Sequence, residues 1–286
     1  MLVKPFHDLD AWVAFYSQAS VPVLRHTVQG LEQMREKADK VNARSIAAII
    51  LNDPLMTLRV LRYIEDHRQK RQTTDITTIE RALMMIGIEP FFRDFQELPI
   101  VEEQFQDQPK ALLGLLKVIN RARKAANWAR EWAIMRHDLD VDEITVATLL
   151  HEVANILMWC FAPALALKGK EMQAADHSLR SATMQIAIYN IHLSDLQTRL
   201  CQIWKLPELL LTLMDETKSE SARARNVLLA SSLARHSANG WDDAALPDDF
   251  KDVAALLHIS HESLMRKLGI EMPKKDDGSD DDAQPQ

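Results

Sequence analysis

The chain has 286 residues with a formal net charge of −7, and 47% of its residues are hydrophobic. This length and apolar content suffice for one large domain or for two packed subdomains with a sizeable core. The acidic balance excludes a general nucleic-acid binder, which normally carries a basic excess. Only seven glycines occur, and the abundance of Ala, Leu, Met, Glu, Arg and Gln favours helices over hairpins.

The cysteine content and the hydropathy pattern predict a cytoplasmic protein. Its two cysteines, Cys160 and Cys201, lie far apart in sequence, and we interpret them as reduced thiols in a chain without a visible signal peptide. No uninterrupted apolar run approaches the roughly 20 residues that span a bilayer, so no membrane contact is expected. Residues 271–286 are rich in aspartate, and this acidic tail is expected to be disordered because it cannot bury apolar surface.

Apolar residues recur at helical spacing in the first hundred residues, and they predict helices near residues 10–19, 21–40, 46–52, 54–64 and 79–86. Asp53 and the proline after it are typical of a helix start, because aspartate accepts hydrogen bonds from free backbone amides. Thr77 and Glu80 have the spacing of a capping box. Gly87 can end that helix in the left-handed conformation, and Pro90 prevents its continuation. We therefore expect a small antiparallel bundle over residues 1–105.

The polar segment 104–109 is the expected junction between two subdomains. Beyond it, the pattern predicts helices near residues 110–136, 141–160, 178–203, 207–217, 219–238 and 248–268. They would form a second helical subdomain over residues 106–270. Since no repeat of fixed period indicates a solenoid, the sequence predicts an all-α fold of two helical subdomains.

Four segments carry motifs in a characteristic order: I-A-A-I-I-L-N-D-P-L at 46–55, I-T-T-I-E-R-A-L-M-M-I-G at 76–87, A-T-L-L-H-E-V-A-N-I-L at 147–157, and a histidine at 192 followed by W-K-L-P at 204–207. Together they resemble the HDOD (HD-related output domain) family, a degenerate branch of the HD metal-dependent phosphohydrolase superfamily. The resemblance covers about residues 20–268. It implies an all-α fold in which an N-terminal helical bundle packs on a degenerate HD-type helical domain.

The resemblance also implies where a metal would be held. HD-superfamily enzymes bind one or two divalent metals through an early His, an adjacent His-Asp pair and a late Asp, with a position left open for water. In this chain His151 takes the first position of the pair and Glu152 takes the second. Where an early ligand is sought, in the helix at 110–136, the chain offers Asn120 and Arg121, and a guanidinium repels a metal ion. Residues 227–234 carry serines in place of the late Ala-Asp step.

These departures predict a vestigial HD site formed by His151, Glu152 and His192, with no catalytic residue, no metal and no cofactor. Hydrogen bonds across the bundle are expected to satisfy the two histidines. Asp215 and Glu216 stand where many family members have a His-His pair. Two alternatives stay open: a metal-bound hydrolase that uses the three vestigial residues, and an anion or nucleotide pocket.

A separate candidate for anion binding is the helical face formed by Lys117, Arg121 and Lys124. Its functional interpretation is a phosphate or nucleotide contact, and its simpler interpretation is a solvated charged face. Trp128 and Trp132 lie four residues apart, which favours packing in the core or between subdomains.

The resemblance implies a non-enzymatic bacterial signal-transduction module that acts through protein–protein contacts. The partners it suggests are diguanylate cyclase, cyclic-di-GMP phosphodiesterase or kinase modules recruited in trans, and a homodimer is compatible with an HD-type bundle. The alternative functions are a metal-dependent phosphohydrolase or phosphodiesterase of nucleotides or cyclic dinucleotides, and a nucleotide-sensing module without turnover.

Overall fold

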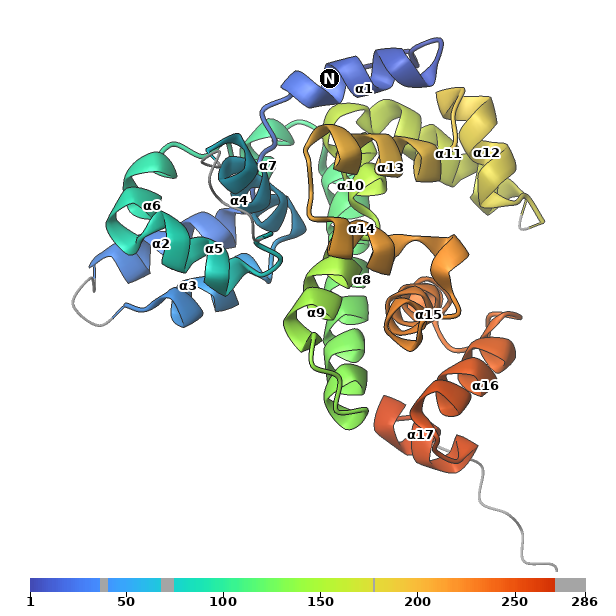
Figure 1. Ribbon diagram of the computed structural model, residues 1–286. Coiled ribbons are helices and arrows are strands. Elements are labelled where there is room, and N and C mark those ends of the chain that lie inside the picture. Colours follow the sequence, from blue (N-terminus) through green and yellow to red (C-terminus); the bar gives the residue numbers. More distant parts are fainter. Residues whose placement is uncertain (37–40, 68–74, 177, 271–286) are drawn as a thin grey trace, which may run out of the picture.

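The computed structural model describes residues 1–36, 41–67, 75–176 and 178–270, so the predicted acidic tail lies outside the described residues. Within these ranges the chain is all-α and contains no β-strand, only an isolated bridge between Val23 and Ile100. A smaller group of helices from the first hundred residues lies beside a larger group from the rest of the chain (Figure 1). The predicted fold class is confirmed.

The first group contains α2 (Arg25–Glu36), α3 (Ala43–Ile50), α4 (Pro54–Asp66), α5 (Ile79–Ile86), α6 (Ile88–Asp94) and α7 (Val101–Gln104). Asp53 begins α4, as the sequence predicts, and its carboxylate accepts hydrogen bonds from the backbone amides of Leu55 and Met56. The same buried carboxylate accepts from the amide of Leu24 and the hydroxyl of Thr27. One side chain therefore fixes the start of α4 against the start of α2.

The helix start predicted at Thr77 is wrong. Thr78 is the N-cap of α5 and accepts a hydrogen bond from the amide of Arg81. Thr77 instead donates to the carboxylate of Glu143 at 2.9 Å. The capping box predicted from Thr77 and Glu80 is therefore displaced by a contact that joins the two groups of helices, which local sequence spacing does not reveal.

The end of α5 follows the prediction. Gly87 has φ of +86°, and its backbone N–H donates to the carbonyl of Leu83. This left-handed region suits glycine, which has no Cβ to clash. Pro90 then lies in the first turn of α6, where the missing N–H of proline costs no hydrogen bond. The chain thus stops one helix and begins another within two residues.

The second group contains α8 (Pro109–Met135), α9 (Val141–Leu150), α10 (Val153–Phe161), α11 (Pro163–Ala175), α12 (Ser181–Tyr189), α13 (Leu193–Ile203), α14 (Glu208–Met214), η2 (Glu216–Lys218), α15 (Ala222–His236), η3 (Ser237–Asn239), α16 (Leu246–Leu257) and α17 (His261–Leu268). The long helix α8 runs through this group and packs against α9, α10 and α15 (Figure 1). The helix predicted over residues 178–203 is in fact two, because Asn190 adopts a left-handed conformation with φ of +62° and ends α12.

The first helix, α1 (Leu9–Gln18), packs on the second group although it precedes the first in sequence. The indole N–H of Trp12 donates to the carbonyl of Tyr189 at 2.9 Å, and the amide of Leu2 donates to the carbonyl of Phe161 at 2.7 Å. Figure 1 shows α1 lying across α13. The predicted grouping of residues 1–105 therefore does not describe α1, and the boundary near residue 105 itself stays a prediction.

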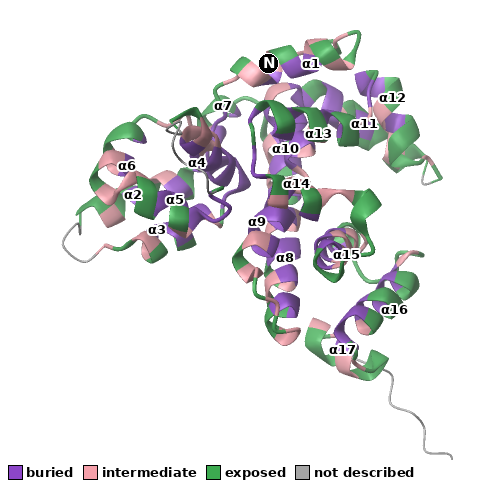
Figure 2. Cartoon of the chain, viewed as in Figure 1, coloured by how far each residue is buried: buried purple, intermediate pink, exposed green. Residues whose placement is uncertain are grey.

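The stretch Val141–Phe161 is long and apolar enough to cross a membrane, with a mean hydropathy of 1.5, but 78% of its most apolar window is buried inside the protein. It consists of α9 and α10, which a turn at His151 and Glu152 separates. Figure 2 shows buried residues along α8, α9 and α10, where these helices contact one another. Such burial is typical of core helices in a soluble protein.

Candidate functional site

The two residues at the motif centre, His151 and Glu152, form the turn between α9 and α10. Gln197 of α13 holds both sides of this turn. Its Nε2 donates to the carbonyl of Leu150 at 2.9 Å, and its Oε1 accepts from the amide of Ala154 at 2.8 Å. One amide group therefore satisfies a carbonyl at the end of one helix and an amide at the start of the next. Sequence reasoning did not identify Gln197, which lies in no motif.

The carboxylate of Glu152 is bound by Arg121, which projects from α8. The Nε of Arg121 donates to Oε2 of Glu152 at 3.0 Å, and Nη2 contacts the same oxygen. The side chains of Arg121 and Glu152 are 20% and 17% exposed, so water screens the pair only partly. The charge of Glu152 is therefore compensated by a guanidinium within the protein.

His151 is largely buried, and burial lowers the pKa of its imidazole below the ordinary value of 6.5. The carboxylates of Glu152 and Glu216 oppose this shift in pKa, and the guanidinium of Arg235 adds to it. His151 is accordingly neutral at neutral pH. Its Nδ1 is buried and has no hydrogen-bond partner within the described residues. The expectation that hydrogen bonds across the bundle satisfy this histidine is therefore wrong for Nδ1.

A cavity of about 280 Å³ opens beside this turn. The polar and charged side chains on its wall come from the turn, from η2 and from α15: His151, Glu152, Glu216, Ser231, Ser232 and Arg235. The hydroxyl of Ser231 is buried and makes no hydrogen bond in the part of the chain that the structure describes. A second, smaller gap lies between the side chains of Arg121, Thr148 and Ser231. It is too narrow to hold a water molecule.

The predicted vestigial site is only partly assembled. His151 and Glu152 are adjacent and share the cavity, but His192 does not line it. His192 is half-buried at the N-cap position of α13, and its side chain makes no capping hydrogen bond there. Glu216, which the sequence placed only as a substitute for a family histidine, does reach the cavity. The serines predicted in place of a late aspartate reach it as well.

The three residues of the predicted anion face have different surroundings, and the face itself stays a prediction. Lys117 is exposed, while the guanidinium of Arg121 binds Glu152. Lys124 lies over the rings of Trp128 and Trp241, with Nζ 4.6 and 5.1 Å from the ring centroids. Nζ of Lys124 also donates to the hydroxyl of Ser237 at 3.2 Å. Partial burial lowers the pKa of Lys124, although the residue as a whole is exposed.

Trp128 and Trp132 stack with ring centroids 6.4 Å apart. Trp132 is buried and Trp128 is half-buried. Both belong to α8 and contribute to packing, as their spacing predicts.

The residues present do not fit the metal that HD-superfamily enzymes hold. In the described ranges, no group of three or more His, Cys, Asp or Glu side chains is arranged to bind a metal ion. The Oε2 atom of Glu152 already accepts both hydrogen bonds from Arg121. A catalytic metal needs about three protein donors and an open position for water. At this site the carboxylate of Glu152 is bound by Arg121, and no second histidine lies beside His151 in the cavity wall.

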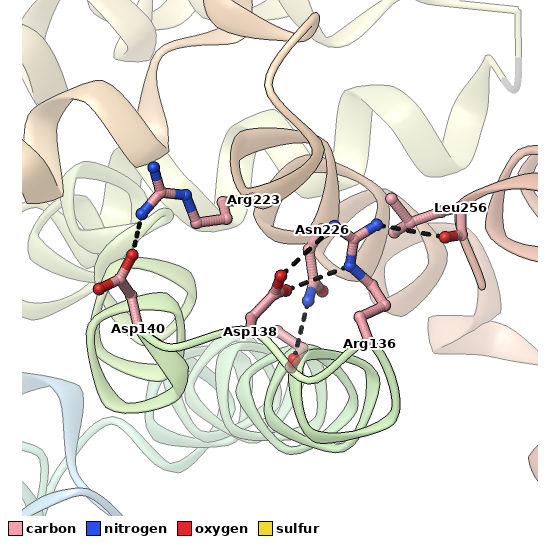
Figure 3. A network of polar contacts seen from close by, with 7 residues as sticks. Arg136, Asp138, Asp140, Arg223, Asn226 and Leu256 are labelled. Carbon is pink, nitrogen blue, oxygen red and sulfur yellow. Dashed lines mark hydrogen bonds and ion pairs between the residues drawn. The ribbon is translucent and has the colours of Figure 1, made fainter.

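Polar contacts away from the cavity fix α15, which supplies its serines and Arg235 (Figure 3). Asn226 is buried and donates from Nδ2 to the carbonyl of Ala129 in α8 at 3.0 Å. Arg223 pairs with Asp140 just before α9. Arg136, at the end of α8, donates from Nη1 at 3.2 Å to a backbone carbonyl of α16, the helix that packs against α15. One wall of the cavity is therefore held at a fixed position relative to α8.

Comparison with known proteins agrees with the motif order. The family model described as the HDOD domain matches residues 21–219. The structure is similar to the MmoQ response regulator from Methylococcus capsulatus, with a TM-score of 0.66, 18% identity, and coverage of 88% of this chain and 98% of the other. It is also similar to a virulence factor from Campylobacter jejuni, with a TM-score of 0.63, 17% identity, and coverage of 93% of each chain. No curated protein sequence matches the chain.

Proposed function

Because the chain belongs to the HDOD family, we propose that it is a bacterial signal-transduction module that acts by binding partner proteins and not by catalysis. The observation that carries this proposal is the ion pair between Arg121 and Glu152. A guanidinium binds the carboxylate at the centre of the motif, and no group of three or more potential metal ligands exists within the described residues. Hydrolysis assisted by a metal has no support in such a site.

The comparison structures support the regulatory half of the proposal. One of them carries the name response regulator, and its likeness to this chain extends over most of both proteins. Partner modules of the cyclase, phosphodiesterase or kinase classes remain the proposed targets, because they are the modules to which the family is linked. Both cysteines are buried as free thiols, which is compatible with the proposed location in the cytoplasm.

Affinity capture from an extract of the native cell, followed by reconstitution from purified parts, tests this function. The full chain is the bait, and the expected result is a partner with a signalling domain that binds the purified protein in a fixed ratio. His151→Ala should still bind it, because the imidazole is largely buried and presents little surface to a partner.

A panel of phosphate esters assayed with Mn²⁺ tests the alternative of a phosphohydrolase. We expect no turnover above the background rate. Hydrolysis that His151→Ala abolishes would contradict the proposal and establish the enzyme instead.

A further inference from the structure

Two arginines, Arg59 and Arg62, lie one helical turn apart on α4. A backbone carbonyl fixes each of them: Nη1 of Arg59 donates to Val21, and Nη2 of Arg62 donates to Ser17 at 3.3 Å. The guanidinium of Arg62 also lies over the ring of Trp204, 4.8 Å from its centroid. Both guanidinium groups are therefore held in defined positions, where α4 meets the end of α1 and the end of α13.

Neither arginine has a carboxylate partner, although both are half-buried. Within the described residues, their side chains hydrogen-bond to backbone carbonyls and take part in no ion pair. Arg121 and Arg136, which are also half-buried, each pair with a carboxylate of the protein. The two positive charges on α4 thus lack the compensation that these other arginines have.

Burial and mutual repulsion both act against these two charges. Burial lowers the pKa of Arg59, and the positive charge of Arg62 lowers it further. Burial also lowers the pKa of Arg62, and the charge of Asp66, one turn further along α4, opposes that shift. Since arginine stays protonated in proteins, both charges persist at a cost in free energy that a bound anion would reduce.

One atom of the pair adds to this cost. Nε of Arg59 is buried and has no hydrogen-bond partner within the described residues. Solvent does not reach this atom, so a ligand would not contact it. The contacts of a ligand would come from the terminal N–H groups of the two guanidinium groups, which carry more donors than the backbone carbonyls accept.

We propose that Arg59 and Arg62 together bind a phosphate group, either as inorganic phosphate or as part of a phosphate monoester. Side chains three residues apart on a helix are neighbours, with Cβ atoms about 5–6 Å apart, so both can reach one anion. A phosphate dianion balances two positive charges and offers oxygens in several directions. A planar carboxylate, by contrast, is satisfied by the two parallel N–H groups of a single guanidinium.

The proposed site lies where the two groups of helices meet. Arg62 belongs to the first group, whereas Ser17 and Trp204 belong to α1 and to the end of α13, which pack together. A phosphate that compensates the two arginines would remove their repulsion and stabilise this junction. The inference goes beyond the proposed function and needs neither a partner protein nor any particular state of the turn at His151.

Titration of the full chain with inorganic phosphate, followed by NMR of the arginine Nε–H groups, tests the proposal in the native protein. The signals of Arg59 and Arg62 should shift together and saturate at one phosphate per chain. The signal of Arg225, a half-buried arginine of α15, should stay in place. Chloride at the same ionic strength is the control for general screening and should shift neither signal of the pair.

Two further probes identify the source of the phosphate group. One is a short peptide with a single phosphoserine, and the other is adenosine monophosphate. If either binds more tightly than inorganic phosphate, it represents the class of natural ligand. If inorganic phosphate binds at least as tightly as both, the free ion is the ligand.

Substitutions test the contribution of each side chain. Arg59→Gln and Arg62→Gln should each weaken phosphate binding by about ten- to a hundredfold, the loss expected for a hydrogen bond between charged groups. Arg225→Gln is the matched control and should leave the affinity unchanged. Because each of the first two variants also loses a bond to a backbone carbonyl, circular dichroism should first establish that it is folded.

The proposal is overturned if phosphate at millimolar concentration leaves the signals of Arg59 and Arg62 in the native protein unchanged. It is also overturned if chloride shifts them equally, or if folded Arg59→Gln and Arg62→Gln bind as the native protein does; the phosphate would then be an adventitious ion only. None of these results bears on the proposed function, which capture of a partner tests separately.

Discussion

Arg121 and Glu152 lie 31 residues apart in sequence, and Nε and Nη2 of the arginine both point to one carboxylate oxygen of the glutamate. In HD-superfamily enzymes, which the motif at residues 147–157 resembles, the residue after the histidine is a metal ligand. Here the positive charge next to that residue comes from a side chain of α8. This relationship explains how a carboxylate can persist in a partly buried turn without a metal ion.

Removal of the guanidinium should destabilise the protein. We expect Arg121→Met to lower the free energy of unfolding by about 1–3 kcal/mol, less than for a fully buried pair because both side chains are partly exposed. Urea denaturation measures this change. The double variant Arg121→Met with Glu152→Gln should recover part of the loss, since no uncompensated carboxylate remains.

Arg130→Met is the matched control for Arg121→Met. Arg130 lies on the same helix and pairs with Asp142, but those side chains are 42% and 53% exposed. Its loss should cost less than about 1 kcal/mol. Equal effects of the two substitutions would show that the pair between Arg121 and Glu152 has no special part in the site.

Gln197 should be essential to the turn that contains His151. Gln197→Ala leaves the carbonyl of Leu150 and the amide of Ala154 without their partner, and we expect a loss of about 1–3 kcal/mol in the free energy of unfolding. Amide hydrogen exchange at Ala154 should become faster. Gln202→Ala changes an exposed glutamine of the same helix and is the control. If both variants are equally stable, the bridging role of Gln197 is refuted.

The close approach of α8 and α10 depends on Gly114. A Cβ atom at this position would lie 2.1 Å from the ring of Trp159. Alanine favours a helix by about 1 kcal/mol over glycine, yet we expect Gly114→Ala to be net destabilising, by about 1–3 kcal/mol, because the core is overpacked. Thermal unfolding measures the change.

Two further variants define the cause of this loss. Gly30→Ala, where the nearest atom would be 3.2 Å away, should cost much less than Gly114→Ala. Combining Gly114→Ala with Trp159→Leu should cost less than the sum of the two single changes. If the free-energy costs of Gly114→Ala and Trp159→Leu simply add in the double variant, a direct clash between the two side chains is refuted.

Stability should fall in mild acid because of His151. Burial holds the pKa of its folded-state imidazole below 6.5, so the unfolded chain takes up a proton before the folded protein does. The contribution of His151 to stability is therefore complete above pH 6.5 and is lost as the pH falls toward the lower pKa of the folded state.

Comparison with His151→Gln isolates this effect from that of other titrating groups. As the pH falls from 7 to below the folded-state pKa of His151, the free energy of unfolding should decrease more in the native protein than in the variant. Urea denaturation at a series of pH values measures this difference. NMR titration of the His151 ring measures its pKa directly. A midpoint at or above 6.5 is incompatible with the proposed burial.

Local signals in the sequence predicted local structure well. Asp53 begins a helix because its carboxylate has several free amides within reach, and Gly87 ends one because it tolerates positive φ. Both requirements are satisfied by neighbouring residues, so spacing alone reveals them. The same applies to the amphipathic pattern that predicted the all-α fold.

The contacts that sequence reasoning missed join distant segments. Gln197 is 43 residues from the amide that it accepts from, and Thr77 is 66 residues from the carboxylate to which it donates. The break at Asn190 left no proline or glycine as a signal. Arg121 was recognised as hostile to a metal, but its pairing with Glu152 requires knowledge of which faces of α8 and α9 meet.

Metal content is the most direct test of the central claim, that an ion pair and not a divalent cation occupies the motif at His151 and Glu152. The purified full chain is incubated with Mn²⁺ or Zn²⁺, dialysed, and examined by elemental analysis. We expect far less than one bound metal ion per chain, because Arg121 pairs with Glu152. One tightly held metal per chain, lost in His151→Ala, would contradict it.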